Sequence, residues 1–189
     1  MDKINLSIIR QTFANAVFTH KVQEVAAETN QRRALYVKIS NIIIVAIVLT
    51  LLVIQSASPT ENIFSYIGAG ITVGEIIFLI IQLSFNFEQQ MILNKNSALK
   101  YMQLRDKYIL LIADLVNEKT TNDELISRRN LLQSEYQIIS DLAPQTGPKE
   151  YDEAQFRLNK KGVVSGEQFT WSDEEIDRFL PEKLRIKNI

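Results

Sequence analysis

Two long apolar runs dominate the pattern of the chain, and a short polar turn separates them. Residues 39–60 contain no charged side chain, and residues 63–85 contain one, Glu75, almost at the midpoint of the run. The hydrocarbon core of a bilayer is about 30 Å thick and is crossed by about 20 apolar residues in a helix. Both runs reach that length, so the pattern predicts a transmembrane helical hairpin over residues 39–87.

The basic residues that flank this hairpin predict its orientation. The turn, residues 56–62, has no Lys or Arg, whereas both outer flanks do. The flanking residues are Arg32, Arg33 and Lys38 before the hairpin, and Lys95, Lys100, Arg105 and Lys107 after it. Because cytoplasmic flanks carry the excess of basic residues, we expect a cell-membrane protein with two spans and both termini in the cytoplasm.

The polar segments on either side also have helical periodicity. Residues 1–38 lack Gly and Pro, and we expect one helix to run through them into the first span. The helix of the second span is expected to continue through residues 88–118, and a further helix begins at Thr121 or Asn122, either of which can cap it. The predicted fold is an all-α membrane protein, with a two-transmembrane helical hairpin and a cytoplasmic helical bundle built from the N-terminal helix and the post-hairpin helices.

The chain after Ala143 is expected to form a tail of short helices. Ser172 and Glu175 have the spacing of a capping box at the start of one of them, and Trp171 lies just before it. The apolar residues of this tail predict that it docks on the rest of the chain or on a partner. The expected segments are the N-terminal helix, 1–38; the hairpin, 39–87; a cytoplasmic helical hairpin, 88–143; and the C-terminal tail, 144–189.

Glu75 is the most unusual residue of the predicted hairpin. A carboxylate at the bilayer midplane costs about 2.5–3.5 kcal/mol, so such residues usually face a bundle interior or water. Polar or small residues share its helix face, and one hairpin cannot enclose them. The predicted pore-lining or oligomer-interface residues are Gly68, Thr72, Glu75, Gln82 and Asn86, with Leu79 as the apolar member of the stripe.

This stripe predicts a homo-oligomer in which several copies turn it toward a common axis. The alternative is that Glu75 is protonated and serves only to hydrogen-bond one helix to another. Gly70 and Gly74 lie on a different face of the same helix, and their four-residue spacing allows helices to pack closely.

The composition of the chain disfavours several kinds of binding site and catalytic site. The 21 basic and 22 acidic residues nearly cancel, so a nucleic acid partner is not expected. There is no cysteine, and His20 is the single histidine, which disfavours a zinc site and a conventional catalytic triad. No phosphate-binding loop is present, so we expect neither a cofactor nor enzymatic activity.

The order of these elements resembles that of the SLATT domains, two-transmembrane effectors of bacterial conflict systems. The motifs that carry the resemblance are RRALY (32–36), ALKY (98–101), LRDKY (104–108), RRNLL (128–132), APQT (143–146), Tyr151 with Ala154, and EEIDRFLP (174–181). The resemblance implies a pore-forming effector of anti-phage defence in the bacterial inner membrane, which depolarises the cell and causes abortive infection.

The resemblance also implies partners. These are the lipid bilayer, further copies of the chain, and a cyclase-type nucleotidyltransferase, a nucleotide sensor or another defence protein encoded nearby, with a cyclic nucleotide as one candidate signal. Two other functions fit the residues alone. The hairpin could anchor an interaction or scaffold protein, or Glu75 could serve a small ion-conducting transporter subunit.

Overall fold

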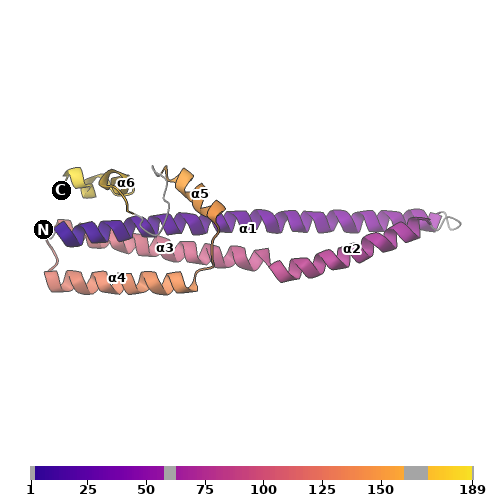
Figure 1. Cartoon of the computed structure of the whole chain (residues 1–189), viewed down its shortest axis with the longest axis horizontal. Coiled ribbons are helices and arrows are strands. Elements are labelled where there is room, and N and C mark those ends of the chain that lie inside the picture. The colour runs from indigo at the N-terminus through magenta and orange to yellow at the C-terminus, as the bar shows by residue number, and fades with distance from the viewer. Residues whose placement is uncertain (1–2, 58–62, 160–169, 189) are drawn as a thin grey trace. The chain divides into compact units, whose positions relative to one another are not determined.

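The described part of the chain, residues 3–57, 63–159 and 170–188 of a computed structural model, contains helices joined by turns and no strand (Figure 1), which confirms the all-α class. The α-helices are α1 (Lys3–Ala57), α2 (Ile63–Phe85), α3 (Phe87–Val116), α4 (Asn122–Leu142), α5 (Pro148–Arg157) and α6 (Asp173–Asp177). Two 3-10 helices, Glu182–Leu184 and Ile186–Asn188, follow. The chain divides into two compact units: a helical unit, Met1–Ala27 with Leu93–Ile189, and a hairpin unit, Glu28–Ile92.

α1 is one uninterrupted helix of 55 residues, as the absence of Gly and Pro before the first span predicts. One stripe along it repeats at alternating steps of three and four residues and is buried or partly buried throughout. Its members are Leu6, Ile9, Phe13, Ala16, His20, Gln23, Ala27, Asn30, Ala34, Val37, Asn41, Ile44, Val48, Leu51 and Gln55. This is the heptad spacing of helices that pack at a shallow angle.

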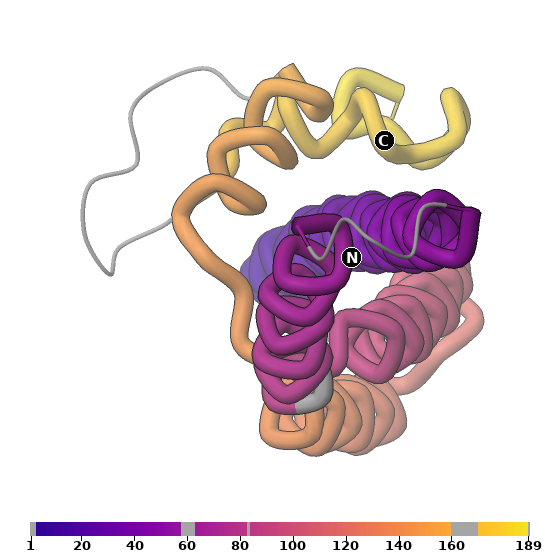
Figure 2. The backbone as a smooth tube through the Cα atoms, turned by 90° about the vertical axis from the view of Figure 1, so that its right-hand side faces the viewer, coloured from indigo at the N-terminus to yellow at the C-terminus, as the bar shows by residue number. Residues whose placement is uncertain are grey.

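The core of the helical unit is formed where α1, α3 and α4 pack together (Figure 2). Ile9 and Phe13 of α1 and Leu104 and Leu111 of α3 are fully buried. The buried stripe of α4 is made of Leu125, Leu132 and Ile139. Thr121 is the cap of α4, because its hydroxyl accepts from the backbone N–H of Glu124. The predicted bundle of three helices is therefore present in this unit.

The C-terminal segment, residues 170–188, docks on α1 of its own chain, on the side opposite to α4 (Figure 1). Trp171 is buried, and its backbone N–H donates to Gln11 at 2.9 Å while its carbonyl accepts from the same side chain at 2.7 Å. The indole N–H of Trp171 donates to Asn15 at 2.9 Å, and its ring meets that of Phe18 edge to face. Of the two possibilities left open by the sequence, docking in the same chain is the one observed.

A buried arginine fixes the same segment to α1. Arg10 is only 1% exposed, and its guanidinium donates to Asp177 at 2.8 Å and to Asp173 at 3.2 Å. It also donates to the carbonyl of Leu184 at 3.4 Å. The carboxylate of Asp177 in turn accepts from the backbone N–H of Ile186 at 3.0 Å. α6 and the chain after it are thus tied to α1 by one charged side chain, in addition to the burial of Ile176, Leu180 and Leu184 in the core.

Two tyrosines of α3 lie in the core with different hydrogen-bonding environments. The hydroxyl of Tyr101 bonds to Ser140 at 2.8 Å, whereas the buried hydroxyl of Tyr108 has no partner among the described residues. Burial raises the pKa of Tyr108, and the nearby Tyr136 and Glu135 raise it further. The ionised form of Tyr108 is therefore strongly disfavoured in the folded state.

Replacing these tyrosines with phenylalanine is expected to have opposite outcomes. Tyr101→Phe loses a hydrogen bond and should lower the free energy of unfolding by about 1 kcal/mol, while Tyr108→Phe removes an unpaired hydroxyl and should leave it equal or higher. Because its pKa is raised in the folded state, Tyr108 contributes stability below about pH 10 that is lost as the pH rises further. The free energy of unfolding of Tyr108→Phe should therefore fall less steeply above about pH 10 than that of the natural chain. Unfolding in detergent, followed by circular dichroism, checks both; equal losses for the two variants would contradict this account.

Candidate functional site

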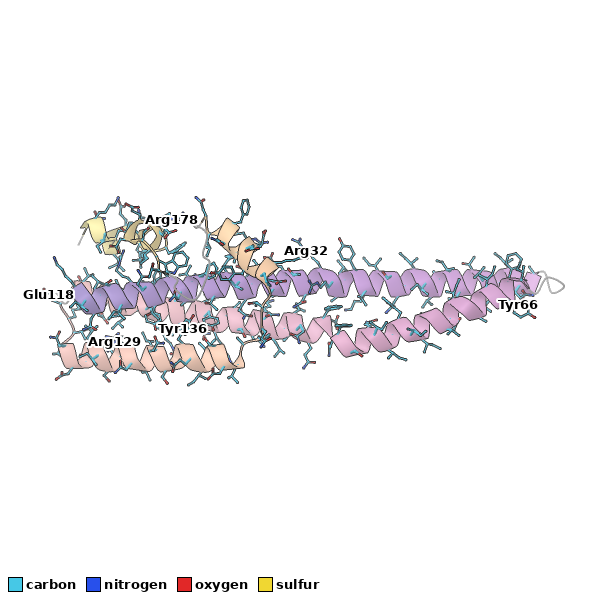
Figure 3. The ribbon with its side chains drawn as sticks, in the orientation of Figure 1. Arg32, Tyr66, Glu118, Arg129, Tyr136 and Arg178 are labelled. Atoms are coloured by element: carbon cyan, nitrogen blue, oxygen red, sulfur yellow. The ribbon has the colours of Figure 1, made fainter. Side chains whose placement is uncertain are left out.

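α1 and α2 each contain a stretch that is long and apolar enough to cross a membrane. Large apolar side chains on their outer faces are exposed, including Ile42 and Val53 of α1 and Ile76 and Ile80 of α2. Helices that expose apolar side chains in this way are suited to lipid rather than water. Figure 3 shows Tyr66 near the turn end of the hairpin and Arg32 toward its other end, which suits an aromatic residue and a basic residue at the two ends of a span.

The two spans pack along a seam made of their partly buried positions. The α2 members are Phe64, Gly68, Ile71, Glu75, Phe78 and Gln82, which again alternate in steps of four and three. Two hydrogen bonds set the antiparallel register. Asn41 donates to the side chain of Gln82 at 2.8 Å, and the Gln55 side chain accepts from the backbone N–H of Ser65 at 3.1 Å. The seam is therefore polar at both ends.

The structure divides the predicted polar stripe between two environments. Gly68, Glu75 and Gln82 lie on the seam and are buried or partly buried, whereas Thr72 is exposed and donates its hydroxyl to the carbonyl of Gly68 at 2.9 Å. Asn86 lies at the break after α2. Periodicity predicted that these residues share one face of α2. In the structure, part of that face contacts α1 and part of it is exposed.

Gly70 and Gly74 lie away from the seam and are exposed. A Cβ built on either glycine would meet no atom within 4 Å. The close helix packing predicted for them is thus not used between α1 and α2, and their surface is open for another helix.

Glu75 is partly buried in the apolar middle of the seam. The register set by Asn41 and Gln82 places it opposite Val48 of α1, two turns from Gln82. The neighbouring seam positions of α1 are Ile44 and Leu51, and the structure gives Glu75 no hydrogen-bond partner among the described residues. An acid at this depth needs water or a polar partner, and the hairpin itself supplies neither from α1.

The helix predicted to follow the second span is present as α3, but a one-residue break at Asn86 separates it from α2. The φ of Asn86 is 32°, in the left-handed region, which Asn tolerates better than most residues. Its side-chain oxygen accepts from the backbone N–H of Gln89 at 3.2 Å, which caps the start of α3. The seam position before the break, Gln82, and the one after it, Phe87, are five residues apart, so the break shifts the helical phase.

A cleft of about 210 Å³ opens beside this break, between α1 and the junction of α2 with α3. Its polar lining comes from Lys38, Gln82, Asn86 and Glu88. Lys38 and Glu88 form an ion pair in which both side chains remain about half exposed. Arg33 lies over the ring of Phe87, 6.0 Å from its centroid.

No group of three or more His, Cys, Asp or Glu residues in the described ranges could hold a metal ion. His20, the single histidine, is partly buried on α1. Burial lowers the pKa of His20 below its usual value, although the nearby Glu24 opposes the shift. At neutral pH it is therefore mainly uncharged, as suits a packing residue.

These features define a class: a helical protein in which a hairpin with two candidate transmembrane stretches is joined to a helical unit that has its own core. A family model described as SMODS and SLOG-associating 2TM effector domain family 4 matches residues 6–175. The chain belongs to this family, the SLATT domains, as the sequence motifs predicted. No curated protein and no solved structure gives a significant match to the chain.

Membership makes the protein a two-transmembrane effector domain of the kind associated with SMODS and SLOG proteins. The family is generally considered to consist of non-enzymatic membrane effectors. The match ends inside α6, so Asp177 and the chain after it, which contact Arg10, lie beyond the matched range.

Two features of the site were not predicted from the sequence. The pairing of Asn41 with Gln82 was not expected, although each is a lone amide near the same end of its span. The break at Asn86 carries neither Gly nor Pro, so its signal is limited to the tolerance of Asn for positive φ.

Proposed function

We propose that this effector forms pores. Several copies assemble in the bacterial inner membrane and, on a signal, open an aqueous path that depolarises the cell during phage infection. The observation that carries the proposal is Glu75, an acid at the midpoint of a span, opposite apolar residues of α1. Intramembrane acids commonly mark ion or substrate pathways.

Assembly is required because two helices cannot enclose water. The exposed glycine face of α2, Gly70 and Gly74, allows close approach of a helix from a second copy. In the open assembly, Gly68, Thr72, Glu75, Gln82 and Asn86 face the common path. Since three of these residues touch the seam in the single hairpin, opening involves a change at the contact of α1 with α2.

The signal is proposed to come from the systems after which the family is named. A cyclic nucleotide made by a cyclase-type nucleotidyltransferase, or a nucleotide sensor encoded nearby, would favour the open assembly. Shifting a two-state equilibrium from almost closed to almost open requires a preference of about 5.5 kcal/mol. The helical unit, which is held together by a well-packed core, is the part that would receive this signal in the cytoplasm.

A second candidate function is that of a membrane-anchored interaction protein. It is favoured by an exposed apolar stripe on α4, made of Leu131, Ile138 and Leu142, on the side away from the buried stripe. In that case the hairpin only tethers the helical unit. The same stripe is also compatible with contact between copies in a pore.

Replacing the hairpin distinguishes the two functions. Residues 39–87 are exchanged for an unrelated two-pass hairpin of equal length, and membrane potential is followed with a fluorescent dye in expressing bacteria. The pore proposal predicts that the natural chain depolarises the cells and that the exchange abolishes this effect. Full activity after the exchange would favour the tether, and the absence of depolarisation by the natural chain would count against the pore.

A further inference from the structure

The cleft beside Asn86 has the chemistry of an entrance for water. Four of its lining side chains, Lys38, Gln82, Asn86 and Glu88, are polar or charged, although it adjoins a span whose other side chains are mostly apolar. Its volume, about 210 Å³, exceeds that of several water molecules at about 30 Å³ each. An apolar contact between two spans would not need such a lining.

The ion pair at the cleft is suited to opening. The side chains of Lys38 and Glu88 are 59% and 52% exposed. Exposed pairs of this kind contribute little stability. Separating the two charges therefore costs little.

An unpaired atom points to water at the inner end of the cleft. Gln82 lines the cleft, and Asn41 donates to it from α1. The Oδ1 atom of Asn41 is fully buried and has no hydrogen-bond partner among the described residues. Leaving a buried carbonyl unpaired is costly, and a water molecule that enters from the cleft would offset this cost.

Glu75 lies deeper along the same seam, with Phe78 between it and Gln82. The sequence of groups along the seam is thus a polar cleft, the Asn41–Gln82 pair, an aromatic ring and an acid. This order is that of a hydrated entrance, a constriction and an internal charged site.

We infer that the cleft is a hydrated entrance for small cations, built into each hairpin on its predicted cytoplasmic side, and that the Asn41–Gln82 pair closes it toward Glu75. The hydration of the cleft is inferred from the geometry of a single hairpin. The conduction role of the entrance rests on the proposed pore function. The pair and the cleft therefore act as a gate that precedes any path along an oligomer axis.

Cysteine labelling tests the entrance directly, because the natural chain has no cysteine. The Gln82→Cys and Ile81→Cys variants place a thiol at adjacent positions, one in the cleft and one on the exposed apolar face. Inside-out membrane vesicles are treated with a charged, membrane-impermeant thiol reagent. Phe156→Cys, at a position 80% exposed in the helical unit, reports the orientation of the vesicles.

The Gln82→Cys thiol is expected to react on the order of tenfold faster than the Ile81→Cys thiol, since the reactive thiolate forms in water and not in lipid. Equal rates would overturn the inference. Since Gln82→Cys also removes the pair, Val37→Cys and Ile39→Cys repeat the comparison from α1 with the pair intact. Faster labelling of Val37→Cys is expected there as well.

The closing role of the pair is tested at Glu75→Cys. Adding Asn41→Ala should increase labelling at this position severalfold, whereas adding Ile42→Ala, a change on the exposed face next to it, should not. Equal labelling in both backgrounds would overturn the gate. These readouts do not depend on leakage, so a chain that labels as expected but never depolarises cells would contradict the pore and leave the entrance standing.

Discussion

Cells that express the Glu75→Leu variant are expected to keep their membrane potential under conditions in which the natural chain depolarises them. The acid costs about 2.5–3.5 kcal/mol when it lies dry at the midplane, and leucine removes that cost from the closed state. The dry, closed form is then favoured on the order of a hundredfold more than before, because about 1.4 kcal/mol corresponds to a factor of ten. The measurement is dye-reported potential at matched levels of membrane-inserted protein.

Matched variants separate the charge from the volume of the side chain. Glu75→Gln keeps a polar group and is expected to give an intermediate loss, while Ile76→Leu, on the exposed face beside it, should behave as the natural chain does. Thr72→Val and Gln82→Leu remove the neighbouring polar groups of the stripe. If all of the stripe variants depolarise cells as fully as the natural chain, the pore-lining role of this face is excluded.

Arg10→Leu is expected to lower the free energy of unfolding of the helical unit by about 3 kcal/mol. Removal of one partner from a buried ion pair leaves the other charge without compensation, and Asp177 is mostly covered, with its side chain 14% exposed. Asp173 is more than half exposed and adds little. Because Arg10 holds α6 and the chain after it, the C-terminal segment should detach before the core unfolds.

Limited proteolysis of the purified protein in detergent, together with thermal unfolding, measures this effect. The Arg10→Leu variant should be cleaved near residues 170–188 at protease levels that spare the natural protein. Arg157→Leu serves as the control, since its pair with Glu153 is a surface contact within α5 and its loss should cost less than about 1 kcal/mol. Equal protection of both variants would show that the arginine is not what holds the segment.

The hairpin could be predicted from the sequence because bilayer thickness is a severe constraint on length and polarity. The uninterrupted α1 followed from the absence of any residue that breaks a helix before Ala57. The capping box of α6 was likewise local: Ser172 accepts from the N–H of Glu175, whose carboxylate accepts from the N–H of Ser172. In each case residues close in the sequence, or the bilayer, determine the outcome.

The contacts between distant segments could not be predicted in this way. Helical periodicity showed that Gly68, Glu75 and Gln82 share a face, but it did not show that this face meets α1. The long heptad stripe of α1 is the signal that could have indicated it, since Asn41 is the member of that stripe that pairs with Gln82. Arg10 is followed by Gln11 and Thr12, as in a solvated turn of helix, and its burial depends on two acids more than 160 residues away.

The most direct measurement of the central claim is ion flux through liposomes that contain the purified protein at increasing density. A pore made of several copies predicts that flux rises more steeply than in proportion to protein density, and that Glu75→Leu removes most of it at every density. Flux that rises only in proportion to density, or that is the same for the natural chain and Glu75→Leu, would contradict the account.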